Sequence, residues 1–508
     1  MDFEYIVAGA GTAGCVLAAR LSEQPEVRVL VLETGSSART HAMTVPSAWP
    51  ENLGSAADWG EHTTPQASTG PVRYPRGRAL GGSGAINAMA HVRGHRAVYD
   101  SWADSGAAGW GFRDLLPYFQ RSEQAAGRDP ALRGTSGPVR VAPATAPQHP
   151  VARAFMQALA AAGYPVTDDL SGARQEGACW ADLAISGGER ASSADAYLRP
   201  ILDRPNLRLL TGCLVTRLLI DRGQCTGVRF IRDGQAAEAR ATGEVILAAG
   251  AIGSPQLLML SGIGPARQLR GLGVEIAADL PGVGANLQDH PVVYTSHAAT
   301  APLPASRYNH GEAYAALRSD LAGAWPDLHL FPILLPIAPA RCRPPAAGFV
   351  LAAAVMAPDS RGSVTLASAD PQAAPSIDPG FLRDDRDTGR LEAAVTMARD
   401  AAASAAFTPV RQAEAWPGPT VRTRADLRAW IRRSVDSYYH PAGTCRMGTD
   451  PAAVVDPQLR VRGITGLLVA DASVMPLIPN AHPNATVLAI AERAAAMITT
   501  TDSRTAPS

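Results

Sequence analysis

The pattern of apolar and polar residues predicts a chain in which short buried strands alternate with helices. An apolar run at 5–8 leads into small residues, and apolar positions at helical spacing follow over 15–21. A second apolar run at 27–32 ends at an acidic residue. Strand, helix and strand in this order are typical of a parallel βαβ unit. By the same criteria we expect further strands at 244–249, 327–332, 348–352 and 467–470, and helices at 380–405, 424–433 and 485–497.

A glycine-rich loop joins the first strand to the first helix. Residues 9–14 are Gly-Ala-Gly-Thr-Ala-Gly, and Glu33 ends the second strand, 19 residues after Gly14. Gly9 permits the tight turn, Gly11 lets the backbone approach a pyrophosphate, and Gly14 lets the helix pack closely on the strand. The helix N-terminus stabilises phosphate charge, and the acid can accept hydrogen bonds from ribose hydroxyls. This fingerprint predicts a dinucleotide site but does not distinguish NAD from FAD.

Composition excludes several classes of function. The 508-residue chain has 46 basic and 46 acidic residues, and its formal net charge of +0 argues against a nucleic-acid or membrane-surface partner. Every basic residue is Arg, so neither a Schiff-base Lys nor a phosphate-binding Walker Lys is present. No apolar run is long enough to span a bilayer. Asp2 and Glu4 stand where a signal peptide would carry basic residues, so we expect a cytoplasmic protein.

The cysteines and histidines show no metal-binding pattern. The six cysteines are scattered, without a CxxC pair, and in a chain of this length we expect them to be reduced thiols. No group of His, Cys and carboxylates has metal-ligand spacing, and no Ser lies in a nucleophile elbow. We therefore expect neither a bound metal nor a serine nucleophile.

Further motifs indicate which of the two dinucleotides, NAD or FAD, the chain binds. They are RYPRGRALGGSGAIN at 73–87, EVILAAGAIGSPQLLMLSGIG at 244–264, GVGANLQDH at 282–290, YHPAGTCRMG at 439–448 and VADASVMP at 469–476. With these stretches in this order, nearly the whole chain resembles the glucose–methanol–choline (GMC) family of FAD-dependent oxidoreductases. The resemblance implies that the chain binds FAD and oxidises an alcohol.

The resemblance also implies a fold class and a domain organisation. The fold is α/β (mixed with α+β), with a Rossmann-like FAD-binding domain and a second domain in which a sheet and helices bind the substrate. Because the FAD motifs lie at both ends and in the middle of the chain, the FAD-binding domain is discontinuous, over 1–145, 190–295 and 436–500. Residues 146–189 and 296–435 form the substrate-binding domain, with the helices 380–405 and 424–433 on one face of its sheet. We expect residues 501–508 to be a disordered tail.

The mode of FAD binding follows from the second glycine-rich loop. Members of the family that tether FAD covalently use a His just before the Asn of this loop, whereas this chain has Ile86 before Asn87, so the resemblance implies non-covalent FAD. Two positions depart from the family pattern: Gly84 follows Ser83, and His91 occupies a later position, where we expect a structural role. The residues that the resemblance places at FAD are Gly9, Gly11, Thr12, Ala13, Gly14, Glu33, Arg78, Gly81, Gly82, Ser83, Asn87, Ala88, Val215, Ala249, Gly250, Asp471, Ala472, Pro483 and Asn484.

Two of the eleven histidines lie in motifs that indicate chemistry. His440 lies in a Tyr-His-Pro turn, and His482 lies just before the last helix, for which Asn484 is a natural N-cap. Oxidation of an alcohol by a flavin needs a base for the hydroxyl proton while the hydride moves to flavin N5, and a neutral imidazole suits this task. The resemblance implies that His440 is the base and His482 its partner. The sequence leaves open that the two roles are exchanged.

The substrate is predicted less sharply. A quaternary ammonium needs carboxylates and an aromatic cage, whereas the segment 296–350 offers Glu312 and Asp327 with a few aromatics that we expect to lie in the core. We expect an uncharged primary alcohol, apolar or aromatic, and either O2 or another electron acceptor. The alternatives are a flavin-containing lyase that cleaves cyanohydrins, a choline-type dehydrogenase, and an NAD-dependent dehydrogenase that uses only the first fingerprint. The oligomeric state is not predicted.

Overall fold

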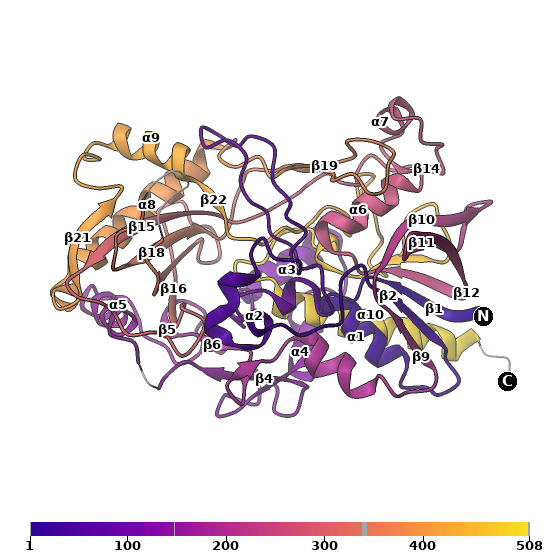
Figure 1. Cartoon of the computed structure of the whole chain (residues 1–508), viewed down its shortest axis with the longest axis horizontal. Helices are drawn as coiled ribbons and strands as arrows, with labels where there is room; N and C mark the ends of the chain where they lie inside the picture. The colour runs from indigo at the N-terminus through magenta and orange to yellow at the C-terminus, as the bar shows by residue number, and fades with distance from the viewer. Residues whose placement is uncertain (1, 147, 338–342, 506–508) are drawn as a thin grey trace.

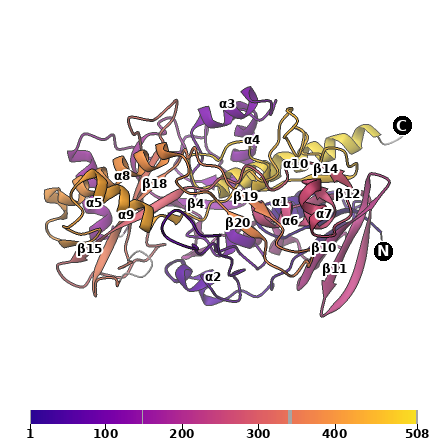
Figure 2. The same cartoon turned by 90° about the horizontal axis from the view of Figure 1, so that it is seen from above.

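Two seven-stranded sheets lie at opposite ends of an elongated molecule (Figure 1). The computed structural model describes residues 2–146, 148–337 and 343–505. Seen from above, the hairpin strands of the first sheet and the helices that cover the second remain at opposite ends (Figure 2). The functional site therefore has to be sought where the segments between the two sheets meet.

Parallel pairing organises the centre of the first sheet. β1 (Asp2–Ala8) pairs in parallel with β2 (Val29–Leu32) on one side and with β12 (Gln235–Leu247) on the other. The apolar runs of β1 and β2 are unbroken because both faces of these strands are covered. The sheet is completed by β9 (Leu207–Leu210) beside β2, β23 (Leu467–Val469) beside the end of β12, and the antiparallel strands β10 (Cys213–Asp221) and β11 (Gln224–Arg232).

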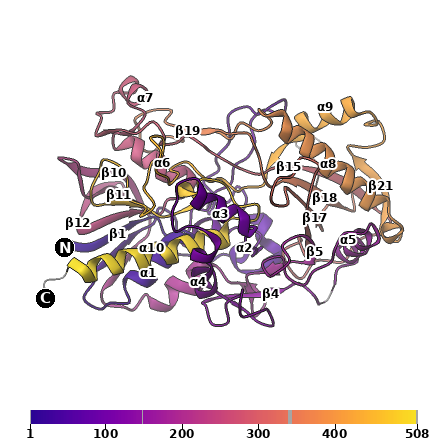
Figure 3. The same cartoon turned by 180° about the vertical axis from the view of Figure 1, so that it is seen from behind.

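Helices cover the first sheet and bring both ends of the chain together. α1 (Thr12–Leu21) follows β1, and α6 (Gly250–Leu260) follows β12. α10 (Asn484–Thr505) packs against α1 and α4 (Phe112–Ser122) and runs along the back of the molecule (Figure 3). The buried apolar residues of these helices join the core of the sheet. The carboxyl ends of the parallel strands are left facing the middle of the molecule, which is where open α/β sheets bind ligands.

The second sheet is antiparallel, with one face under helices. Its order is β21 (Arg411–Trp416), β15 (Pro291–Ala299), β18 (Gly348–Val355), β17 (Leu328–Ile333), β16 (Ala313–Leu317) and β5 (Gly177–Trp180), with β22 (Asp436–Ser437) also beside β15. Leu328 and Leu330 pack toward the helices, which are α5 (Pro150–Ala161), α8 (Asp385–Ala403) and α9 (Arg424–Ser434). Alternation along the strand turns Phe331 to the other face, which looks toward the first sheet.

Shorter elements fill the space between the sheets. The helices are α2 (His41–Thr44), α3 (Arg96–Asp104) and α7 (Ala266–Gly271). The strands are β3 (Glu123–Ala125), β4 (Val139–Pro143), β6 (Asp182–Leu183), β7 (Ile185–Ser186), β8 (Glu189–Arg190), β13 (Ile263–Gly264), β14 (Ala278–Asp279), β19 (Ser363–Thr365) and β20 (Ser376–Asp378). Short helical turns lie at Pro46–Asn52, Gly82–Ala85, Ala194–Leu198, Arg199–Ile201, Ala405–Phe407 and Ala472–Val474.

The mixed α/β fold class and the predicted elements are confirmed, with differences at the boundaries. β15 continues across the predicted boundary at 295/296, and β22 pairs with it, so 291–299 and 436–437 belong to the second sheet. The stretch with β19 and β20 lies within the predicted substrate-binding range, but Val364, Leu366 and Ile377 pack into the core of the first sheet. Strand pairing decides the first point and side-chain packing the second, and a linear motif reveals neither.

The C-terminal helix also differs from its prediction. Asn484 is the first residue of α10 rather than its N-cap, and its Oδ1 accepts a hydrogen bond from the Thr12 hydroxyl at 2.8 Å. The helix continues to Thr505, beyond the predicted end at Met497 and into the range expected to be a disordered tail. Residues 506–508 lie outside the described residues. Among the described helices, none combines the length and apolar character that crossing a membrane requires.

Candidate active site

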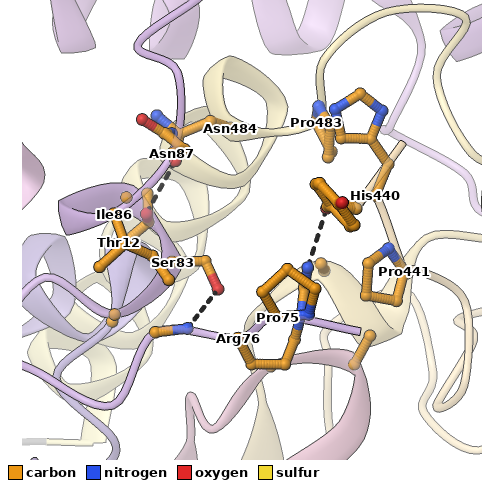
Figure 4. A pocket seen from close by; sticks show the side chains of 18 of the residues that line it. Thr12, Pro75, Arg76, Ser83, Ile86, Asn87, His440, Pro441, Pro483 and Asn484 are labelled. Carbon is orange, nitrogen blue, oxygen red and sulfur yellow. Dashed lines mark hydrogen bonds between the residues drawn. The ribbon is translucent and has the colours of Figure 1, made fainter. Parts of the chain in front are cut away.

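A cavity of about 390 Å³ lies between the two sheets. It begins at the ends of β1 and β2, passes the glycine loop 9–13, and reaches His440 and His482 (Figure 4 shows its middle). The second sheet closes it with side chains from the face that carries no helices, namely Tyr294, Tyr314, Phe331 and Ile333. The cavity thus joins the nucleotide fingerprint to the two predicted catalytic histidines.

Close backbone contacts shape the nucleotide end of the cavity. A Cβ at Gly14 would lie 1.9 Å from the carbonyl oxygen of Gly9, so only glycine lets α1 approach β1 this closely. A Cβ at Gly82, where φ is +54°, would lie 2.7 Å from the Cα of Gly11. The two glycine-rich loops therefore touch through their backbones. No side chain among the described residues caps the N-terminus of α1, so its first amides are available to an anion.

Glu33 is placed as the fingerprint predicts. It directly follows β2, lines the cavity and is buried. Its Oε2 accepts from the amide of Ala10 at 2.8 Å and its Oε1 from the amide of Gly35 at 2.7 Å. Burial raises the pKa of this carboxyl, and the two amides lower it. The carboxylate retains lone pairs that can accept ribose hydroxyls.

The donor set and shape of this end fit FAD. Uncapped helix amides suit the pyrophosphate, Glu33 suits the ribose, and the cavity continues from there toward the histidines, as a dinucleotide with a reactive ring requires. Asp471 fixes this edge of the sheet, because its Oδ2 accepts from the Gly250 amide at 2.8 Å and the Ser254 hydroxyl at 2.6 Å. Asn87 is held by Arg190, whose Nη1 donates to Oδ1 at 2.8 Å.

Most of the predicted cofactor residues line the cavity, and three do not. Those that line it are Gly9, Gly11, Thr12, Ala13, Glu33, Gly82, Ser83, Asn87, Ala88, Val215, Ala249, Gly250, Asp471, Ala472, Pro483 and Asn484. Gly14 lies behind the loop, where it serves helix packing. Gly81 donates its amide to the Ala10 carbonyl at 2.8 Å, and the Arg78 guanidinium lies 5.1 Å from the centre of the Trp59 ring. These three residues shape the loops around the cavity without lining it.

The two predicted catalytic histidines come together. The His440 and His482 rings lie 5.1 Å apart between centroids, although the residues are 42 positions apart in the chain. Asp289 holds the His440 turn, because its Oδ1 accepts from the His440 amide at 2.9 Å and its Oδ2 accepts from the Ser437 hydroxyl. Burial lowers the pKa of His440 well below its ordinary value and that of His482 to about 4. Both imidazoles are therefore neutral near pH 7.

Four side chains around this pair were not among the predicted site residues. His290 Nδ1 lies 2.9 Å from His440 Nδ1, and the Tyr438 hydroxyl lies 2.9 Å from His482 Nε2. His329 and Tyr314 flank the other side of His482, with ring centroids at 5.9 and 6.1 Å. His290 is the last residue of the quoted motif at 282–290, and Tyr438 directly precedes the motif at 439–448, so both positions are accessible from the sequence. The other two come from β17 and β16, and only the pairing of those strands brings them here.

His91 has the structural role expected of it. Its Nε2 lies 2.8 Å from Glu123 Oε2, inside a buried ion-pair cluster that also contains Arg93 and Arg133. Among the described residues, no group of His, Cys, Asp and Glu could hold a metal ion.

Fold and site together define an FAD-dependent oxidoreductase that acts on alcohols, and comparison with known proteins agrees. The chain belongs to the GMC oxidoreductase family: the family's two regions match residues 3–292 and 358–491. Mitochondrial choline dehydrogenase of Homo sapiens is 39% identical, with 98% of this chain and 90% of that protein covered. Oxygen-dependent choline dehydrogenase of Brucella anthropi is 38% identical, over 97% and 95%. The crystal structure of pyridoxine 4-oxidase from Mesorbium loti has a TM-score of 0.94 at 36% identity, covering 97% and 99%.

Proposed function

We propose that the protein oxidises a primary alcohol to the aldehyde, with His440 as the base and His482 as its hydrogen-bonding partner. The observation that carries the proposal is the pair of neutral imidazoles, 5.1 Å apart, at the end of a cavity that begins at a dinucleotide fingerprint. When bound, FAD supplies an acceptor for the hydride of the alcohol carbon. The residues of this chain then have two tasks, which are to take the hydroxyl proton and to hold the oxygen.

The contacts of the two histidines support different tasks. His440 uses Nδ1 for the contact with His290, which leaves Nε2 for the alcohol. His482 uses Nε2 for the contact with the Tyr438 hydroxyl, and its Nδ1 is buried without a hydrogen-bond partner in the described structure. A phenol is a good donor to an imidazole nitrogen, and His482 then carries its own proton on Nδ1. This N–H is suited to donating to the alcohol oxygen as charge develops on it.

The proton and electron balance of the reaction is simple. The alcohol O–H bond breaks, and its electrons form the second C–O bond of the aldehyde. The proton forms an N–H bond on His440 Nε2, and the α-carbon loses a hydride with both electrons of its C–H bond. Desolvation that keeps His440 neutral before the reaction also makes the developing imidazolium costly, so its neighbours matter to the rate.

The lining of the catalytic end supports an aromatic or apolar substrate. Tyr294, Tyr314, Phe331 and Tyr438 face this part of the cavity. The two carboxylates that the sequence offered for a cation are engaged elsewhere: Glu312 accepts from the Ser306 hydroxyl, and Asp327 pairs with Arg390. Neither lines the cavity.

One observation favours a second candidate, an alcohol that carries a cationic group. Glu61 lines the cavity, and its Oε2 is buried without a hydrogen-bond partner in the described structure. Burial raises its pKa to about 7, and a cation beside it would restore its charge. The relatives named choline dehydrogenases also support this candidate, because choline is an alcohol that carries a cationic group. Replacement of Glu61 by Gln should raise KM for choline at least ten-fold if this candidate is right, and should leave benzyl alcohol unaffected.

We also propose that FAD is bound without a covalent link. Ile86 precedes Asn87 in the loop that lines the cavity, and an aliphatic side chain offers no atom for a bond to the cofactor. Acid precipitation of the purified protein should release all of the flavin into the supernatant. Yellow colour retained in the pellet would contradict this proposal.

Anaerobic stopped-flow reduction of the bound flavin tests the main proposal. Benzyl alcohol, pyridoxine and choline are mixed separately with the yellow protein, and bleaching of the visible flavin band is followed. We expect bleaching by at least one of them, with the aldehyde as product, and admission of air then shows whether O2 reoxidises the flavin. Turnover of a cyanohydrin without bleaching would instead support the lyase alternative, and a colourless protein that reduces NAD would support the simple dehydrogenase.

A further inference from the structure

We propose that His290 is a positioning residue that selects the tautomer of His440, so that Nε2 of His440 carries the lone pair that takes the proton. This inference rests on the proposed function, in which His440 is the base. It assigns a task to a residue outside the predicted site, and it decides which of the two site histidines is competent as a base.

The contact between the two histidines is short, buried and fixed from both sides. The two Nδ1 atoms lie 2.9 Å apart, and the rings meet at 87° with centroids 5.1 Å apart. His290 is fully buried, directly before β15. Its amide donates to Asp289 Oδ1 at 2.8 Å, and its carbonyl accepts from the Tyr438 amide at 3.0 Å. Because Asp289 Oδ1 also accepts from the His440 amide, one carboxylate holds both backbones.

Two neutral imidazoles that meet through Nδ1 share a single proton, so one donates and the other accepts. If His290 donated, His440 would carry its proton on Nε2 and would offer the alcohol a donor instead of a lone pair. If His440 donates, its Nε2 is free to accept. The geometry of the pair alone allows both arrangements, and the other nitrogen of His290 decides between them.

The Nε2 atom of His290 favours the second arrangement. It is buried, and among the described residues it has no hydrogen-bond partner. The backbone of Met356 opposes the lowering of the His290 pKa, as a carbonyl acceptor beside an imidazole does, and Nε2 is the nitrogen left for that carbonyl because Nδ1 faces His440. A carbonyl oxygen attracts an N–H and repels a lone pair, so the proton of His290 belongs on Nε2. His290 Nδ1 is then the acceptor, His440 Nδ1–H the donor, and His440 Nε2 the base.

The same contact stabilises the charge that forms in the reaction. When the proton arrives on His440 Nε2, the imidazolium still donates from Nδ1 to a neutral acceptor, and a hydrogen bond to the charged form favours it. Burial lowers the pKa of His290 itself to about 3, so it stays neutral over the working range. The other titratable or charged groups that face this pair are His482, His329, Arg76, Asp289 and Tyr438.

The test compares His290→Leu with His290→Asn. Leu fills the space but accepts no hydrogen bond, whereas the Asn Oδ1 occupies the place of Nδ1 and its amide can still face Met356. The matched control is His297→Leu, which removes a buried histidine of the adjoining strand β15 that stacks on Phe349 and does not line the cavity. Each holoenzyme is checked for flavin content and thermal midpoint, and kcat/KM is measured as a function of pH with the alcohol that bleaches the wild type.

We expect His290→Leu to lower the plateau of kcat/KM about 10²-fold, within the range that general-base catalysis contributes. Its acid limb should move to lower pH by about one unit, the worth of one hydrogen bond to the charged form. His290→Asn should restore both values to near wild type, and His297→Leu should change neither.

Three outcomes would overturn the inference. They are an unchanged kcat/KM in His290→Leu, an equal loss in the Leu and Asn variants with the acid limb unmoved, and a loss explained by missing flavin alone. Failure of the proposed function is a separate result, because it would show as undiminished flavin reduction in His440→Ala, whatever His290 does.

Discussion

The two ends of the cavity are built by different physical means. The nucleotide end uses backbone amides, close glycine contacts and one buried acid, most of them within residues 9–33. The catalytic end uses imidazoles and phenols from four separate segments, around 290, 329, 438–440 and 482. The first depends on a shape that one local motif can specify. The second depends on desolvated side chains whose protonation is set by neighbours that only the folded chain supplies.

The largest effect should come from the backbone shape of the nucleotide end. In Gly14→Ala, the new Cβ would meet the Gly9 carbonyl oxygen, which lies 1.9 Å from its ideal position, so α1 must move away from β1. We expect the purified variant to lose nearly all bound flavin, measured as the ratio of visible to ultraviolet absorbance. Gly271→Ala is the matched control, because nothing lies within 4 Å of a Cβ there. Full flavin content in Gly14→Ala would show that the close contact is not needed.

The next effect should fall on the catalytic end alone. His440→Ala removes the base but leaves the nucleotide end untouched, so flavin content should stay the same. We expect anaerobic flavin reduction to slow by about 10²–10⁴-fold, the usual contribution of a general base. Stopped-flow measurement at saturating alcohol checks this, with His149→Ala as a control at a histidine that bonds the Pro304 carbonyl. Wild-type bleaching in His440→Ala would remove this residue from the chemistry.

The buried, uncharged His297 of the second sheet should make the folded protein less stable at acid pH. Burial lowers the pKa of His297 to about 3, below its ordinary value of 6.5, so the unfolded state binds the extra proton between these values. The contribution of neutral His297 to the free energy of unfolding is fully present above pH 6.5. It is lost as the pH falls from 6.5 toward 3, at about 1.4 kcal/mol per pH unit.

His297→Leu should abolish that part of the pH dependence. We expect the fall in unfolding free energy between pH 7 and pH 5 to be smaller by about 2 kcal/mol than in the wild type. Urea titrations at the two pH values measure the difference. The same fall in both proteins would mean that His297 takes up a proton in the folded state.

A smaller effect should come from the acid of the nucleotide end. Glu33→Gln keeps the size of the side chain but places an amide donor against the amide of Ala10 or Gly35. We expect FAD affinity to fall about ten-fold, the worth of roughly one hydrogen bond. Fluorescence titration of the apoprotein with FAD measures this, with the exposed Glu238→Gln on β12 as a control. An equal Kd for both variants would leave no role for the charge of Glu33.

The difference between the nucleotide end and the catalytic end also explains which parts of the site could be predicted from the sequence. Gly9, Gly11, Gly14 and Glu33 follow one another in a strand–helix–strand unit, so their geometry is local and was predicted. His440 and His482 were found because each lies in a family motif. His329 was out of reach, because its place follows from the pairing of β17 with β16 and β18 and from which face each residue takes. The tautomers likewise depend on burial and on contacts such as that between His290 and His440.

The strands that pair in the first sheet are far apart in the chain, and this separation affects folding during synthesis. β1 ends at Ala8, but its partner β12 begins at Gln235 and the adjoining β23 only at Leu467. At a synthesis rate of about 5–20 residues per second, one hydrogen-bonding edge of β1 stays without its partner strand for roughly 10–45 s, until β12 emerges from the ribosome. Until then the nascent chain exposes a strand edge that other chains can pair with. We therefore expect the yield of active protein to depend on chaperone protection during translation as well as on the stability of the finished fold.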